Sequence, residues 1–251
     1  MKNTIIKDAV AEIVFARDEC VGVLDSLKKF CPPDSNGNYP GTFRLLATPM
    51  FYSVWERCFT ACHAITLRLL RDSTSKASEL EITQRAAWLL RAPFYQSFCS
   101  RLKDWNMEID HSKGTKKGQF VITVEFLAAL EQWTNLPIDQ ATDAEEIVMT
   151  YSNVNPDVVN VNALAVGIDA HNDFKKIKFG RLHDLVGMRN GIGHGAIIAP
   201  PSNDQFCNLF EFTEDLILDY SAAFITWINS ITPSISHPSL EPVQIDSTSP
   251  S

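Results

Sequence analysis

Apolar residues recur every three or four positions through most of this chain, and that helical spacing constrains its fold more than any other feature. The clearest stretches are residues 4–30, 42–71 and 203–231, each with an apolar stripe along its length. An amphipathic helix presents such a stripe to a hydrophobic core. We therefore expect a mainly α-helical bundle, in which Pro49 either kinks the second helix or delays its start to about residue 48.

The segments between these helices extend the prediction. Helical composition is also found in 75–106 (broken at Pro93), in 141–152, in 157–167 and in 177–194. Residues 119–124 are β-branched and predict one short strand; alternatively, they begin a helix that continues through Phe126 and Trp133. The Pro- and Ser-rich residues 232–251 lack apolar periodicity and predict a disordered tail. We expect residues 1–231 to form one all-α domain with small elaborations, and the 4–30 helix is a candidate elaboration.

Composition and charge exclude several classes of protein. The chain of 251 residues, 45% of them hydrophobic, is long enough to bury a substantial core. Its net charge of −8 argues against non-specific coating of nucleic acid, which needs a basic surface, although a small basic pocket is still compatible. No apolar run approaches roughly 18 residues, so we expect no signal peptide, no transmembrane helix and no membrane association. The six scattered cysteines suggest reduced thiols and a cytoplasmic location.

Polar chemistry is concentrated at the end of the 177–194 helix. Arg189 and Asn190 are followed by His194 and by three glycines within five residues. Glycine costs about 1 kcal/mol relative to alanine inside a helix, so this cluster needs an explanation. The simplest one is that Gly195 adopts the left-handed conformation that closes a helix. The other two glycines would then leave open space around the imidazole, where a ligand or another backbone could come close.

A second candidate site is the cluster Cys58, Cys62 and His63, whose side chains are all potential metal ligands. Both cysteines fall on the apolar stripe of the 42–71 helix, where free cysteine packs as a small hydrophobic residue. We therefore expect a packing role and no metal.

A third candidate is the basic cluster Lys113, Lys116 and Lys117 in segment 111–118, which contains glycine and which we expect to be a loop. Such clusters are usually solvated; the alternative is that these lysines bind phosphate groups of RNA.

The run Leu185–Gly195, with Arg189-Asn190 and then His194, resembles the signature of the HEPN superfamily. This all-α group contains ribonucleases and related modules, and its motif is Arg, a polar residue, and His after four to six positions. The run is similar in particular to the RiboL-PSP-HEPN branch, which is found with defence and toxin systems.

Two further segments resemble parts of this superfamily. Tyr52-Ser-Val-Trp55-Glu56 is similar to the acidic helix that lies beside the motif, and Asn160-Val-Asn162 is similar to the segment that precedes it. The resemblance thus spans roughly residues 42–231. Arg57 and His63 also fit the loose spacing, but this second match lacks the asparagine and the glycines and lies inside a regular helix. We therefore place the motif at 189–194.

The resemblance implies a metal-independent endoribonuclease without a cofactor, in which the 2′-OH of RNA attacks the phosphate and leaves a 2′,3′-cyclic phosphate. His194 would act as acid or base, because imidazole titrates near neutral pH. Arg189 would stabilise charge on the phosphate, and Asn190 would orient the histidine or bind the phosphate. Glu56 would hold Arg189 in place. In this family two protomers share a composite cleft, so a homodimer is expected.

The acidic chain predicts a particular structured RNA, for example tRNA, or an activity that a partner such as an antitoxin or an activator controls. Two alternatives stay open. The first is a non-catalytic HEPN module that binds a nucleotide or a protein through the same cleft. The second is a structural helical domain, in which His194 and Arg189 only favour the helix dipole at a glycine-rich C-terminus.

Overall fold

The computed structural model describes residues 2–107, 115–138, 143–151 and 153–231, and this part of the chain is all-α, without a strand. Its helices are α1 (Lys2–Phe30), α2 (Gly41–Ser73), α3 (Ile82–Leu89), α4 (Pro93–Met107), α5 (Thr115–Asn135), α6 (Ala144–Ile147), α7 (Pro156–Val166), α8 (Asn172–Lys176), α9 (Leu182–Gly193) and α10 (Asn203–Ser230), with a 3₁₀ turn η1 at Ala77–Glu79. The predicted fold class is confirmed. The tail predicted at 232–251 lies outside the described residues.

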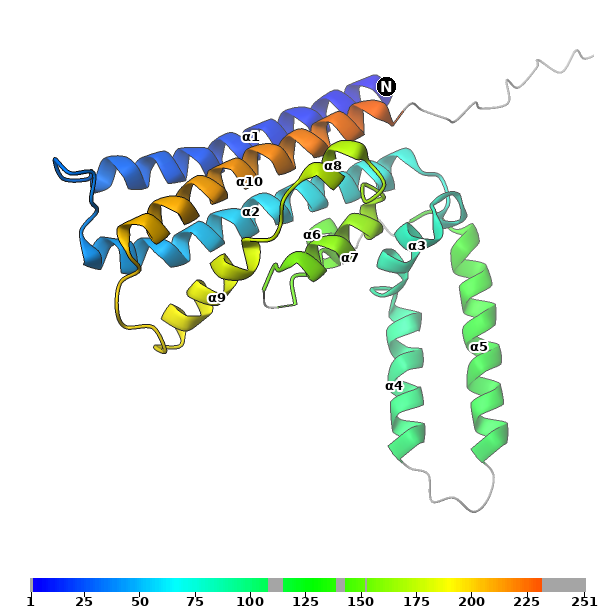
Figure 1. Ribbon diagram of the computed structural model, residues 1–251. Helices are drawn as coiled ribbons and strands as arrows, with labels where there is room; N and C mark the ends of the chain where they lie inside the picture. The colour runs from blue at the N-terminus through cyan, green and yellow to red at the C-terminus, as the bar shows by residue number, and fades with distance from the viewer. Residues whose placement is uncertain (1, 108–114, 139–142, 152, 232–251) are drawn as a thin grey trace, which may run out of the picture.

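The core is formed by α1, α2 and α10, the three longest helices, which lie side by side (Figure 1). Aromatic rings join α2 to α10: the ring centroids of Phe51 and Phe206 are 5.1 Å apart, and those of Trp55 and Tyr220 are 5.0 Å apart. Burial of a large apolar side chain contributes about 1.5–3 kcal/mol. The apolar stripes therefore form the elements that the sequence predicted for them.

The starting residue of α2 decides between the two predictions made for Pro49. It starts at Gly41 and includes Pro49, so a start near residue 48 is wrong. Proline removes one backbone donor, but the helix continues because its other turns are buried against α1 and α10. The break predicted at Pro93 is confirmed: α4 begins at this proline, which suits the first helical position.

Two local predictions are corrected. Residues 119–124 lie within α5, so the strand is wrong and the alternative, the beginning of a helix that continues through Phe126 and Trp133, is confirmed. Packing outweighs the β preference of single residues: Phe126 of α5 stacks on Phe98 of α4 at 4.2 Å between ring centroids. The helix predicted at 177–194 begins only at Leu182, since Gly180 lies in a turn between the short α8 and α9.

The antiparallel pair α4 and α5 projects from the bundle as a hairpin, whereas α9 packs against α2 (Figure 1). Among the described helices, none has the length and apolar character needed to cross a membrane.

Candidate functional site

The motif lies on α9, which is held against α2 by its buried residues Leu182 and Leu185. The helix ends as the glycines predicted. The His194 N–H donates to the Asn190 carbonyl at 2.9 Å, and Gly195 follows with a φ of 71°. Only glycine adopts that left-handed conformation without strain, so Gly195 closes the helix.

The other two glycines have different surroundings. A Cβ atom at Gly191 would lie 2.5 Å from Cδ1 of Ile197, whose N–H donates to the Gly191 carbonyl at 2.9 Å. A Cβ atom at Gly193 would meet nothing within 4 Å. The open space predicted beside His194 therefore exists at Gly193, but at Gly191 it is filled by the loop that follows the motif.

The three motif side chains lie at this helix end, and His194 is exposed. Arg189 Nη1 donates to Asn190 Oδ1 at 2.8 Å, and the Asn190 carbonyl accepts the His194 N–H. The Arg189 guanidinium lies over the Tyr52 ring, with Cζ 5.2 Å from the ring centroid. Such a cation–π contact contributes about 0.5–1 kcal/mol near a surface. A hydrogen-bonded cation and amide thus stand one helical turn before an accessible imidazole at the end of α9.

Glu56 is linked to Arg189 through Tyr52. No ion pair joins the two charged residues, both of which the structure describes; instead the Tyr52 hydroxyl donates to Glu56 Oε1 at 3.1 Å. The same hydroxyl accepts the Val154 N–H at 2.7 Å. Burial raises the pKa of Tyr52 to about 12, so the phenol stays protonated and available as a donor. Tyr52 is the site residue whose role the sequence did not show, although it stands one helical turn before the predicted glutamate.

The predicted segment Asn160–Asn162 contributes through its second asparagine. Asn162 is buried on α7, accepts the Met149 N–H at 2.9 Å and donates to the Met149 carbonyl at 2.7 Å, whereas Asn160 is exposed. These bonds fix the start of the segment that continues to Val154, the residue bound to Tyr52. Asn162 therefore supports the site at a distance and does not reach the motif.

The loop after the motif is tied to the start of α2, a connection that the sequence did not signal because it depends on packing between distant segments. Arg44 Nε donates to the Pro201 carbonyl at 2.8 Å, and a second nitrogen of Arg44 donates to the Tyr39 carbonyl. Asn203 Oδ1 accepts the Tyr39 N–H at 2.9 Å. The chain leaving Gly195 is therefore anchored at its far end.

The second match to the Arg and His spacing is not an accessible site. His63 is fully buried, and its Nε2 lies 2.7 Å from the Tyr220 hydroxyl. Burial lowers the pKa of His63 to about 3, because the protein interior disfavours the charged imidazolium. Arg57 lies on the surface and pairs with Glu19 at 2.7 Å. His63 thus lies in the core and Arg57 on the surface, so the two residues do not form one accessible site.

The cysteines beside His63 pack in the core: Cys58 is 0% and Cys62 1% exposed. Within the described part of the chain, no group of three or more His, Cys, Asp or Glu side chains is arranged to hold a metal ion.

The predicted lysine cluster is described only in part, by the backbone of two of its three residues. Lys113 lies outside the described residues. Lys116 and Lys117 belong to the first turn of α5, not to a loop, because α5 already begins at Thr115; their side chains are also outside the description. Figure 1 places this turn at the tip of the projecting hairpin, away from α9.

Four cations that sequence reasoning missed directly precede α9: Lys175, Lys176, Lys178 and Arg181, all exposed. Three of them, from Lys176 onward, line a cavity of about 500 Å³ that Asp215 and Asp219 of α10 also line. The signal was available, since four of seven consecutive residues are basic in an acidic chain.

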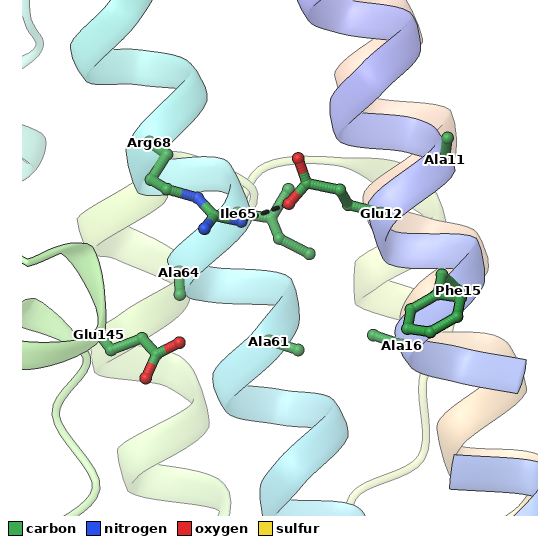
Figure 2. A pocket seen from close by; sticks show the side chains of 9 residues that line it. All are labelled: Ala11, Glu12, Phe15, Ala16, Ala61, Ala64, Ile65, Arg68 and Glu145. Atoms are coloured by element: carbon green, nitrogen blue, oxygen red, sulfur yellow. Dashed lines mark hydrogen bonds and ion pairs between the residues drawn. The ribbon is translucent and has the colours of Figure 1, made fainter. Parts of the chain in front are cut away.

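A different cavity, of about 410 Å³, lies between α1 and α2 and contains none of the motif residues (Figure 2). An ion pair between Arg68 and Glu12 crosses it, and the other lining side chains are mostly small and apolar. It offers little chemistry of its own.

Comparison with known proteins gives one family match. A family model described as HEPN_MAE_28990-like HEPN matches residues 24–240, which include α2, α9 and all motif residues. Neither a curated protein nor a solved structure matches the chain. The family match confirms the predicted HEPN superfamily. The branch differs in name: the matching model is HEPN_MAE_28990-like, whereas the motif resembles the RiboL-PSP-HEPN branch.

Proposed function

The chain belongs to the HEPN_MAE_28990-like HEPN family, and on this premise we propose that it is an endoribonuclease that cleaves RNA without a metal ion. One observation carries the proposal: the exposed imidazole of His194 stands at an open helix end, with the bonded pair Arg189 and Asn190 one turn behind it. Attack by an internal hydroxyl on a phosphate needs proton transfer and stabilisation of the charge on the phosphate oxygens, and imidazole and guanidinium suit these two tasks.

In the proposed reaction the ribose 2′-OH attacks the neighbouring phosphorus, and the bond from phosphorus to the 5′ oxygen breaks. The products are a 2′,3′-cyclic phosphate and a 5′-OH. His194 moves a proton at one of the two oxygens, and Arg189 stabilises the charge on the phosphate oxygens. Asn190 holds the guanidinium through its 2.8 Å hydrogen bond, and Glu56 acts through the Tyr52 hydroxyl.

We further propose that the enzyme works as a homodimer with a composite site. The reaction needs a base at the 2′ oxygen and an acid at the 5′ oxygen, and one motif supplies a single imidazole. A second copy facing the first would bring the other imidazole and a second guanidinium. The exposure of His194 and the open space at Gly193 support this arrangement.

The substrate that we propose is a particular structured RNA, for example a tRNA, in the cytoplasm. The net charge of −8 disfavours indiscriminate RNA binding, whereas the basic run from Lys175 to Arg181 offers local phosphate contacts before α9. An effector of defence or of a toxin–antitoxin system, controlled by a partner protein, fits such restricted activity.

The test is cleavage of total RNA in excess EDTA by the purified wild type, by His194→Ala and by the matched control His183→Ala. His183 is an exposed histidine at the other end of the same helix. We expect cyclic phosphate ends from the wild type and the control, and a loss of cleavage of at least about a hundredfold for His194→Ala. Equal cleavage by all three would refute the mechanism. RNA or nucleotide binding without cleavage by the wild type would instead support the non-catalytic HEPN module.

A further inference from the structure

Tyr151 is an exposed aromatic residue in a backbone conformation that tyrosine rarely adopts. It lies in the segment between α6 and α7, it is 67% exposed, and its φ is 45°. In the part of the chain that the structure describes, it is the one residue other than glycine with a positive φ. This conformation is unfavourable for a residue with a Cβ atom, and such strain persists where the surrounding structure imposes it, typically at functional sites.

Hydrogen bonds on both sides of Tyr151 impose this conformation. Before it, Asn162 of α7 accepts the Met149 N–H at 2.9 Å and donates to the Met149 carbonyl at 2.7 Å. After it, the Tyr52 hydroxyl accepts the Val154 N–H at 2.7 Å. The Tyr151 hydroxyl itself donates to Met149 Sδ at 3.2 Å. The exposed ring is therefore held in one place before any ligand arrives, so a ligand that binds it meets a small entropic cost.

The bond at Val154 also limits the distance between Tyr151 and the motif. The ring of Tyr52, whose hydroxyl binds Val154, has Arg189 Cζ 5.2 Å from its centroid. Helices α6, α7 and α9 all pack on α2, which carries Tyr52 (Figure 1). Because three residues span at most about 10 Å, the Cα atom of Tyr151 lies no more than about 20 Å from the Arg189 guanidinium. An RNA strand of a few nucleotides covers this distance.

A fixed, exposed ring near a phosphate-binding cation can stack on a nucleobase. Stacking of this kind needs a base whose face is free, which unpaired nucleotides provide and a continuous duplex does not. We propose that Tyr151 stacks on an unpaired base of the RNA whose phosphate Arg189 binds. This inference rests on the proposed ribonuclease function, and it adds the residue that contacts a base and selects unpaired RNA.

Replacement of Tyr151 by glycine separates this role from a structural one, because the two predict opposite results. Glycine adopts a positive φ without strain, so Tyr151→Gly should unfold at a temperature equal to or above that of the wild type. The same change removes the ring and should weaken binding of unpaired RNA, whereas Tyr151→Phe keeps the ring and should keep binding. The matched control is Phe15→Ala, which removes a 64% exposed ring from α1, beside a cavity without motif residues.

Each change is combined with His194→Ala, so that RNA is bound without being cleaved. Fluorescence anisotropy measures binding of a labelled pool of random single-stranded RNA of about 16 nucleotides, and of RNA duplexes of the same length. His194→Ala alone, with Tyr151→Phe and with Phe15→Ala should prefer single strands by at least about fivefold, and the combination with Tyr151→Gly should lose this preference.

A preference for single strands that survives Tyr151→Gly would overturn the proposal, and so would equal binding of both RNAs by His194→Ala alone. A lower unfolding temperature of Tyr151→Gly, with weaker binding of both RNAs alike, would make Tyr151 a structural residue and would also overturn it. Cleavage of total RNA is measured separately with His194 intact. Cleavage that requires His194 but binding that ignores Tyr151 refutes stacking alone. Binding as expected, without cleavage by the wild type, refutes the ribonuclease alone.

Discussion

Lowering the pH from 7 to 5 is expected to destabilise this protein through His63, a residue far from the proposed chemistry. His63 is fully buried and has a pKa of about 3 in the folded chain, compared with the ordinary 6.5. Below pH 6.5 the unfolded chain therefore binds a proton that the folded chain does not. Stability rises with pH wherever the unfolded state binds more protons, so the contribution of His63 is lost as the pH falls from 6.5 towards 3.

The magnitude follows from the two pKa values. Each pH unit between them changes the free energy of unfolding by about 1.4 kcal/mol. Between pH 6.5 and pH 5 the wild type should lose about 2 kcal/mol from this one group, a large share of a typical stability of about 5–15 kcal/mol. The loss should continue towards pH 3, where the folded imidazole itself begins to titrate.

Urea unfolding at a series of pH values, with His63→Gln as the comparison, isolates this group from the carboxylates that titrate in the same range. Glutamine does not titrate, yet it can still bond the Tyr220 hydroxyl, which lies 2.7 Å from His63 Nε2. The difference in stability between the two proteins should change by about 2 kcal/mol from pH 7 to pH 5. If the difference in stability between wild type and His63→Gln stays constant with pH, His63 takes up its proton as readily in the folded chain as in the unfolded chain. The argument from burial would then fail.

The remaining predictions concern the surroundings of the motif. Gly191→Ala should lower the free energy of unfolding by about 1 kcal/mol, because its Cβ would meet Ile197, whereas Gly193→Ala should raise it by up to about 1 kcal/mol through better helix propensity. Thermal unfolding compares the pair, and equal shifts would contradict the packing. Tyr52→Phe keeps the ring under Arg189 but leaves a buried N–H unpaired, and should cost about 1–3 kcal/mol. Tyr52→Leu also removes the ring, so its RNA cleavage should fall further, and equal cleavage by both variants would argue against a role for the ring.

The long helices were predictable because burial on one side imposes a period on the sequence, and three such stripes became α1, α2 and α10. Of the two alternatives at residues 119–124, the helix is right and the strand is wrong for a physical reason. β-Branched residues only weakly disfavour a helix, and the stacking of Phe126 on Phe98, whose contact the sequence does not encode locally, decides the outcome.

In the candidate site, too, contacts within one segment could be predicted from the sequence, and contacts between distant segments could not. Arg189, Asn190 and His194 stand on one short segment, so their proximity could be predicted from helix geometry. The route from Glu56 to the motif could not, because it depends on how α2 lies against α9. Packing there puts the Tyr52 ring face against the Arg189 guanidinium and the Tyr52 hydroxyl against the Glu56 carboxylate, so Glu56 is linked to Arg189 through a hydroxyl and a ring face.

The two matches to one Arg and His spacing show which part of the motif carries information. Spacing alone does not distinguish His63 from His194. In the structure His63 is buried against Tyr220, whereas His194 is exposed. What separates them in the sequence is glycine: Gly195 ends the helix in a left-handed turn, and Gly193 leaves the space beside the imidazole empty. A histidine inside an apolar helix stripe is desolvated, whereas a histidine at a glycine-rich helix end can reach solvent and a ligand. The glycines, rather than the Arg and His spacing, therefore identify the accessible site in this chain.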